Sequence, residues 1–187
     1  RTRRSPMWPL LIVLALAVWL AVLYNGLVQL RESAEAAWAD IDVQLKKRYD
    51  LIPNLVETVK GYASHERETL ESVIEARNRA MHAEGPAERA QAEGMLAGAL
   101  KSLFALSEAY PQLQAASSFR DLQDALRQVE RDLAQSRRYY NAVVRDLNTR
   151  VQSVPTVFVA RAFGFRQREF FEVDEGERST PRVSFEE

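Results

Sequence analysis

Hydrophobic residues are continuous at the start of the chain and periodic in the rest of it. An uncharged run of 24 residues extends from position 7 to position 30, longer than the roughly 20 residues that a helix needs to cross a bilayer. Beyond it, apolar positions recur every three or four residues, as in amphipathic helices. The pattern predicts an all-α protein, in which an N-terminal transmembrane helix continues into an antiparallel up-and-down helical bundle.

The uncharged run has the features of a membrane anchor. It is apolar on all sides and carries aromatic residues of the kind that form interfacial belts, namely Trp8, Trp19 and Tyr24. A buried core helix is a poorer interpretation of such a run. A signal peptide cleaved after Ala15-Leu16-Ala17 is the other alternative, although it would leave an apolar new terminus. We therefore expect a single membrane span.

The charges on either side of this span predict its orientation. Three arginines precede it, whereas the first charges behind it are of both signs: Arg31, Glu32, Glu35, Asp40 and Asp42. Cytoplasmic flanks carry the excess of arginine and lysine. We expect a cytoplasmic N-terminus, with all residues after Leu30 on the other side of the membrane.

The stretch from Trp38 to Val59 permits two interpretations of the first helices. Lys46-Lys47-Arg48 suits a last helical turn, Asp50 suits an N-cap, and Pro53 is tolerated in a first turn. This favours a helix end at Tyr49 and a new start at Asp50. The alternative is one continuous helix kinked at Pro53. The first interpretation predicts four bundle helices, over residues 27–49, 50–83, 86–110 and 119–151, and the second predicts three long ones.

Other helix boundaries have clearer signals. Gly85 and Pro86 separate the second predicted segment from the third, and Pro111 terminates the third. Ser118 and Asp121 form a capping-box pattern before the last segment. That segment has the most regular stripe, close to a heptad repeat and typical of a coiled coil: Phe119, Leu122, Leu126, Val129, Leu133, Tyr140, Val143, Leu147 and Val151.

An aromatic and basic segment follows, where an up-and-down bundle returns the chain to the membrane. Rings interleaved with arginines are typical of membrane-interface segments, and the same rings would equally suit a cap on the open end of the bundle. The candidate interface residues are Phe158, Arg161, Phe163, Phe165, Arg166, Phe170 and Phe171. The resulting organisation is a basic N-terminus (1–8), a span (9–28), a bundle (29–152), a juxtamembrane segment (153–172) and an acidic, loosely ordered tail (173–187).

Candidate chemistry is sparse. The chain has no cysteine, and its 25 basic and 26 acidic residues nearly cancel, which argues against thiol chemistry and against a nucleic-acid partner. His65-Glu66 begins like a zinc-protease helix but lacks the second histidine, and His82 has no carboxylate three positions before it. We expect both histidines on the surface and Tyr139-Tyr140 in the core. We predict no catalytic residue, metal, cofactor or small-molecule substrate, and therefore no enzyme.

Several of these stretches resemble the bacterial LemA family. The resemblance covers residues 24–171 and rests on Tyr24-Asn25, the run from Ala37 to Val56, Tyr110-Pro111, Tyr140-Asn141 and Phe163-Gly164-Phe165. It implies a membrane-anchored helical bundle without an established activity, cofactor or catalytic residues. In a bacterium the anchor is expected in the cytoplasmic membrane, and the charges on either side of the span predict the bundle on the outer, periplasmic side. The family often has a second Tyr-Asn pair where this chain has Leu147-Asn148.

Two function hypotheses follow. The first is a non-enzymatic scaffold or adaptor of the cell envelope, anchored in the lipid bilayer and associating with copies of itself or with another membrane protein. The second is a membrane-shaping or lipid-sensing module acting through Val154–Phe171. An enzyme would need a metal or a site shared between subunits.

Overall fold

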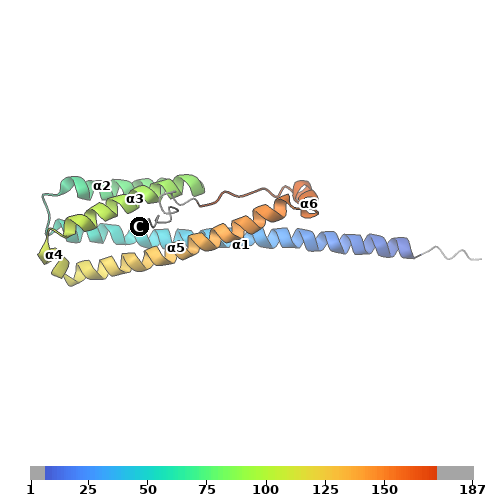
Figure 1. The fold of residues 1–187 in the computed structure, drawn as a ribbon, viewed down its shortest axis with the longest axis horizontal. Coiled ribbons are helices and arrows are strands. Elements are labelled where there is room, and N and C mark those ends of the chain that lie inside the picture. Colours follow the sequence, from blue (N-terminus) through green and yellow to red (C-terminus); the bar gives the residue numbers. More distant parts are fainter. Residues whose placement is uncertain (1–6, 172–187) are drawn as a thin grey trace, which may run out of the picture. The chain divides into compact units, whose positions relative to one another are not determined.

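A computed structural model describes residues 7–171, which form six helices and no strand (Figure 1). The all-α prediction is therefore confirmed. The predicted acidic tail and the basic residues before Met7 lie outside the described residues. The helices are α1 (Trp8–Lys60), α2 (Arg67–His82), α3 (Gly85–Ser107), α4 (Pro111–Ala115), α5 (Ser117–Gln152) and α6 (Thr156–Phe163).

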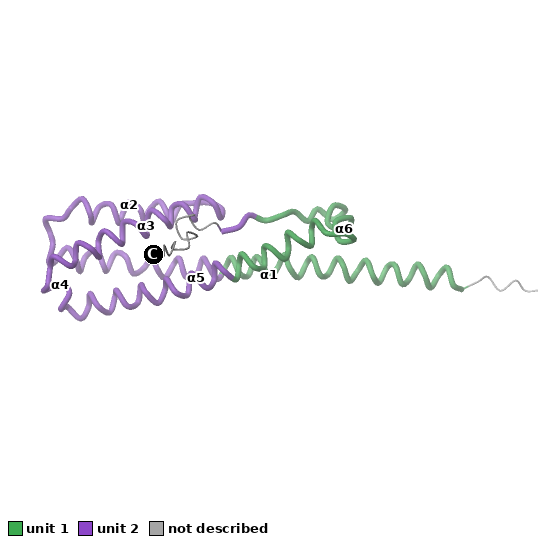
Figure 2. Tube along the Cα trace, in the orientation of Figure 1, with its two compact units in different colours: residues 1–39, 139–168 green, residues 40–138, 169–187 purple. Residues whose placement is uncertain are grey.

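The chain forms two compact units (Figure 2). Within the described residues, unit 1 comprises residues 7–39 and 139–168, and unit 2 comprises residues 40–138 and 169–171. Unit 1 thus holds the N-terminal part of α1, the C-terminal part of α5 and all of α6. Unit 2 holds the remainder of α1 and α5 together with α2, α3 and α4.

The predicted helix boundary at Tyr49 and Asp50 is wrong, because α1 continues through Pro53 to Lys60. The second interpretation is correct in that the helix continues through Pro53. It is wrong in predicting three long bundle helices, because α1 ends at Lys60 and α2, α3 and α5 follow it. The basic residues Lys46-Lys47-Arg48 therefore lie within α1 and do not end a helix. Instead, Lys46 Nζ lies 2.7 Å from the Asp50 carboxylate one turn later, within the same helix.

Arg77 compensates for the hydrogen bond that Pro53 cannot make. In a continuous helix, the amide of residue 53 would donate to the carbonyl of Tyr49, and proline has no amide hydrogen. Arg77 of α2 instead donates its Nε–H to the Tyr49 carbonyl oxygen, over 2.8 Å. A neighbouring helix therefore satisfies the carbonyl that the proline leaves open.

We expect Pro53 and Arg77 to be energetically coupled. Arg77→Leu should destabilise the protein by about 1–3 kcal/mol, because it leaves a partly buried carbonyl unpaired. In a Pro53→Ala background the loss should be at least halved, because the alanine would supply the missing amide. Chemical denaturation of the four proteins of this double-mutant cycle tests the coupling. Equal losses in both backgrounds would contradict it.

The real break between α1 and α2 lies at residues 61–66. Gly61 follows Lys60, and the amides of Tyr62 and Ala63 both bond the carbonyl of Val59, which closes the end of α1. The predicted single helix over residues 50–83 is therefore wrong. Turn-forming residues at Gly61 and Ser64 outweighed the helical spacing around them.

The buried stripes otherwise follow the predicted periodicity. In unit 2, segments of α1, α2, α3 and α5 alternate in direction and share one core (Figure 1). Gly85 has a φ of 73°, in the left-handed region that favours glycine, and Pro86 lies in the first turn of α3, so the predicted break there is confirmed. The largest buried apolar side chains of this core include Ile41, Leu45, Ile52, Leu55, Leu96, Leu103, Leu113, Phe119 and Leu133.

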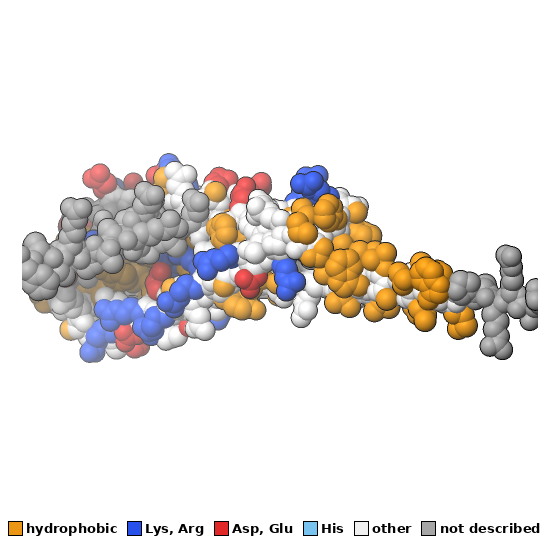
Figure 3. Space-filling view, turned by 45° about the vertical axis from the view of Figure 1, so that its right-hand side comes forward, with side chains coloured by type: hydrophobic (Ala, Val, Ile, Leu, Met, Phe, Trp, Pro, Cys, Tyr) orange, Lys and Arg blue, Asp and Glu red, His pale blue; other side chains and the backbone are white. Residues whose placement is uncertain are grey.

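Unit 1 has a small core and a long uncovered helix. Leu27 of α1 packs with Val159 and Ala160 of α6, and Leu23, Val151 and Phe165 surround them. Before Leu23 the hydrophobic side chains of α1 lie on the surface, with Leu14 58% exposed (Figure 3). A core helix would bury such residues, so the buried-helix alternative does not apply and the stretch is apolar enough to cross a membrane.

Candidate functional site

A cluster of ionisable side chains lies inside unit 2. We call it the Arg48–Glu93 cluster and define it as Arg48, Tyr49, Glu93, Glu130 and Arg137. Arg48 of α1 and Glu93 of α3 are each only 2% exposed, and Arg48 Nη1 lies 2.5 Å from Glu93 Oε2. Charged side chains are almost never this buried unless they are paired.

Side chains of α5 complete the cluster. Glu130 approaches Arg48 Nη2 to 2.7 Å, and Arg137 Nη2 lies 3.8 Å from Glu93 Oε2. The Arg137 guanidinium also stacks over the ring of Phe171, 4.7 Å from its centroid. Two cations and two anions are thus brought together, and the cluster is neutral as a whole.

Burial changes the acid–base behaviour of Tyr49. Its hydroxyl donates a hydrogen bond to Glu93 Oε1. Removal from water, reinforced by this bond and by the charge of Glu93, raises the pKa of Tyr49 far above its ordinary value of 10.0. The folded protein therefore holds Tyr49 in its neutral form, in which it remains a donor to the carboxylate.

The raised pKa of Tyr49 predicts a loss of stability in alkali. Below about pH 10 the tyrosine is neutral in both states, so the contribution is complete. Above that pH the unfolded chain loses the proton while the folded chain keeps it, so stability falls as the pH rises. Tyr49→Phe should flatten this decline, whereas the exposed control Tyr139→Phe should not. Tyrosinate absorbance and denaturant titrations against pH measure both effects, and an unchanged alkaline decline in Tyr49→Phe would contradict the assignment.

The cluster has the composition of a structural network. Its carboxylates face arginines, and within residues 7–171 no group of three or more histidine and carboxylate residues is arranged to hold a metal ion. His65 and His82 are both exposed, as predicted, and His82 Nδ1 contacts the Asn78 carbonyl of its own helix at 2.7 Å. The arrangement can join α1, α3 and α5 through polar contacts.

The sequence analysis did not predict this cluster, although Arg48 and Glu93 lie in register with the apolar stripes of their helices. Arg48 continues the stripe of Leu45 and Ile52 on α1, and Glu93 precedes Leu96 by three residues on α3. Both positions face the core, but charged residue types are normally interpreted as exposed.

Tyr140 is buried near Trp38, with ring centroids 5.3 Å apart, whereas Tyr139 is exposed, contrary to prediction.

In unit 1, the predicted anchor residues lie on the surface of α1. Trp8, Trp19 and Tyr24 are all exposed. Tyr24 also contacts the aromatic segment, because its ring centroid lies 4.8 Å from that of Phe163 and 5.7 Å from that of Phe165. The end of the uncharged run and the aromatic segment are therefore neighbours.

The candidate interface residues divide into two groups. Phe158 and Phe163 are 67% and 65% exposed, and Arg161 and Arg166 are exposed as well. Phe165 is partly buried beneath the Arg31 guanidinium, 5.6 Å from its ring centroid. In unit 2, Phe170 is exposed, whereas Phe171 is only 1% exposed and packs against Arg137. The seven candidates thus do not form one surface.

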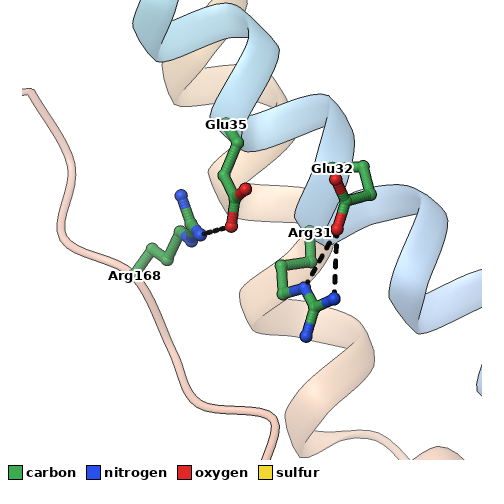
Figure 4. Close-up of polar contacts among 4 residues, drawn as sticks. All are labelled: Arg31, Glu32, Glu35 and Arg168. Carbon is green, nitrogen blue, oxygen red and sulfur yellow. Dashed lines mark hydrogen bonds and ion pairs between the residues drawn. The ribbon is translucent and has the colours of Figure 1, made fainter.

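Two polar contacts hold the segment that follows α6. Asn148 of α5 donates to the Arg168 carbonyl and accepts from the Arg168 amide, both over 2.9 Å, as a neighbouring strand would. The Arg168 guanidinium reaches Glu35 of α1 at 2.5 Å, while Arg31 pairs with Glu32 beside it (Figure 4). Gly164, with a φ of 75°, ends α6 and lets the chain turn towards these partners.

Comparisons with known proteins found a matching family model and curated relatives. Residues 37–185 match the model of the LemA family. The chain is 25% identical over 188 residues to magnetosome protein MamQ of Magnetospirillum gryphiswaldense, which covers 85% of this chain and 69% of that protein. It is 25% identical over 203 residues to magnetosome protein MamQ 2 of Paramagnetospirillum magneticum. That match covers 92% of this chain and 75% of the other protein.

Proposed function

This chain belongs to the LemA family and is a membrane-associated helical protein, and we propose that it is a non-enzymatic scaffold that associates with copies of itself. In this proposal the span anchors it in the bacterial cytoplasmic membrane. Its N-terminus is cytoplasmic and unit 2 is periplasmic, in line with the arginines ahead of the span. Unit 2 carries the surface for association.

A groove on unit 2 is the observation that carries this proposal. It has a volume of about 820 Å³ and lies between the end of α1 and α2. Its apolar lining includes Val56 and Leu70, which are themselves buried in the core, and Ile74, which is partly exposed. An apolar groove between two helices suits an amphipathic helix of a partner.

The charges around the groove favour a second copy as that partner. Acidic and basic residues share its rim: Glu57, Glu71, Glu75, Lys60 and Arg67. Arg67 and Glu71 are one turn apart, yet within residues 7–171 neither forms an ion pair. In a two-fold dimer each surface meets itself, so a rim of both signs can pair Arg67 of one copy with Glu71 of the other.

Site-specific crosslinking tests the association. The chain has no cysteine, so a single introduced cysteine reports one position. Glu71→Cys, at the groove, should give disulfide-linked dimers when membranes containing the full-length protein are oxidised. Ser102→Cys, exposed on α3, is the matched control and should remain monomeric. Equal crosslinking at both positions, or none at either, would contradict a dimer through the groove.

A membrane-shaping or lipid-sensing role of Val154–Phe171 is the second candidate. The observation that favours it is the exposure of Val154, Phe158 and Phe163 in the unit that carries the apolar half of α1. Exposed rings beside arginines are typical of segments that enter the interface between headgroups and acyl chains.

Spin labelling in proteoliposomes distinguishes this role. Labels at Phe158→Cys and Phe163→Cys should collide more with oxygen, which concentrates in the bilayer, than with a water-soluble nickel chelate. A label at Arg131→Cys, exposed in unit 2, should show the opposite preference. Water-like accessibility at both phenylalanine positions would remove the lipid-contact role while leaving the scaffold proposal unaffected.

A further inference from the structure

A second groove, in unit 1, joins apolar and polar surfaces. It has a volume of about 660 Å³ and lies between α1 and the end of α5. Leu23, Leu27 and Leu30 line its apolar part, and Gly26 leaves it open, because a Cβ added there would have no atom within 4 Å. Its polar part is lined by Gln29, Ser33, Asp146, Thr149 and Arg150.

The groove extends from the span into the charged part of the chain. Its lining on α1 runs from Val22 to Ser33, a rise of about 16 Å at 1.5 Å per residue. This length is similar to half of the roughly 30 Å hydrocarbon layer. With the span placed as in the proposed function, Val22 lies at acyl-chain depth and Ser33 lies beyond the first charged residue, Arg31. A bilayer lipid is therefore the ligand that can reach the whole groove.

Two charges in the polar part do not form an ion pair. Asp146 precedes Arg150 by four residues, the order and spacing that favour pairing on a helix. Lys46 and Asp50 form such a pair at 2.7 Å, and Glu75 and Arg79 do so at 2.8 Å. Within residues 7–171, Asp146 and Arg150 form no ion pair, either with each other or with another side chain. One anionic and one cationic group thus face the same groove.

We propose that this groove binds one phosphatidylethanolamine molecule of the bilayer. The phosphate lies on Arg150, the ammonium group lies on Asp146, and an acyl chain follows the open surface over Gly26. The phosphate and the amine of this headgroup are two carbon atoms apart, which matches side chains whose Cβ atoms are about 5–6 Å apart on one helix face.

The same chemistry disfavours the other common headgroups. An ethanolamine ammonium carries three N–H donors for the Asp146 carboxylate, whereas a choline group carries none. Phosphatidylglycerol has a phosphate but no cation, so it would leave Asp146 unpaired beside a negative charge. The inference rests on the anchor of the proposed function, and it concerns which lipid is retained rather than whether the chain enters the membrane.

Lipid retention by the full-length protein tests the proposal. The protein in detergent is incubated with phosphatidylethanolamine, phosphatidylcholine and phosphatidylglycerol of identical acyl chains, and bound lipids are counted by native mass spectrometry. We expect one phosphatidylethanolamine to be retained about fivefold better than either competitor, the effect of roughly 1 kcal/mol for one correctly placed charge. Equal retention of phosphatidylcholine, or stronger retention of phosphatidylglycerol, overturns the proposal.

Paired variants assign the contacts. Asp146→Asn should abolish the preference over phosphatidylcholine, and Arg150→Gln should lower retention of all three lipids. Asp121→Asn and Arg145→Gln, exposed on α5 outside the groove, are the charge controls. They should change neither the preference over phosphatidylcholine nor the retention of the three lipids. If the controls behave like the groove variants, the effect is one of general charge and the proposal fails.

A steric variant tests the acyl contact separately. Gly26→Leu should fill the groove and reduce retention, whereas Ala21→Leu, on the exposed surface of α1 outside the lining, should not. Resistance of each variant to alkaline extraction from membranes shows that the anchor itself is intact. Extraction of the unmodified protein would contradict the proposed anchor, whereas full retention of lipid by Gly26→Leu overturns only the groove.

Discussion

Glu93→Ala should destabilise the protein by about 3–5 kcal/mol, the usual effect of removing one member of a buried ion pair. The substitution leaves Arg48, which is 2% exposed, without its closest carboxylate, and it removes the acceptor of the Tyr49 hydroxyl. Because most domains are stable by only about 5–15 kcal/mol, this is a large fraction of the total. Denaturant unfolding of the full-length protein in detergent measures the loss.

Two comparisons separate burial from charge in this experiment. Asp50→Ala breaks the exposed pair with Lys46 and should change stability by at most about 1 kcal/mol. The triple variant Arg48→Met, Tyr49→Phe, Glu93→Leu replaces the closest polar contacts with apolar packing and should recover most of the loss. If Glu93→Ala costs no more than Asp50→Ala, the cluster does not stabilise unit 2.

Two charges in the N-terminal span should release the protein from the membrane. Leu14 and Val18 are exposed on α1, and replacing both with arginine costs about 5–7 kcal/mol on insertion scales. Each apolar residue contributes only about 0.3–0.6 kcal/mol to insertion, so the two arginines cancel the contribution of about ten apolar residues. Fractionation followed by alkaline extraction should find the unmodified protein in the membrane and the variant largely outside it.

The control carries the same charges elsewhere. Val43→Arg combined with Met81→Arg adds two arginines at exposed positions of unit 2 and should leave the protein in the membrane. Persistence of the Leu14 and Val18 variant in the membrane would show that another part of the chain anchors it. The mass of the membrane-bound protein also tests the signal-peptide alternative, because cleavage after Ala17 would remove Trp8.

The parts of the fold that could be predicted are those in which local sequence signals determine the helix boundary or the buried face. On α5, apolar positions three and four apart coincide with the buried face, and Gly85-Pro86 marks a break by backbone chemistry alone. The continuation of α1 through Pro53 was not predictable in this way. Pro53 is a strong local signal, and its effect was cancelled by Arg77, which is distant in sequence and close only in the fold.

The polar contacts were the least predictable part. The pairing of Arg48 with Glu93 joins residues 45 positions apart, and only their positions within apolar stripes indicated burial. The aromatic segment after residue 153 lacks a long period, so its sequence could not separate surface rings from core rings. Phe163 and Phe171 have similar sequence environments, yet one is exposed and the other is enclosed by Arg137.

The hydrogen bond from Arg77 to the Tyr49 carbonyl has an evolutionary consequence. As long as position 53 is proline, no amide at that position can donate to the Tyr49 carbonyl, and the arginine at position 77 supplies this hydrogen bond instead. A lineage that replaces the proline should free position 77 to drift, and a lineage that first loses the arginine should come under selection to replace the proline. Across homologous genes, these two sites should therefore change together more often than their separation along the chain suggests.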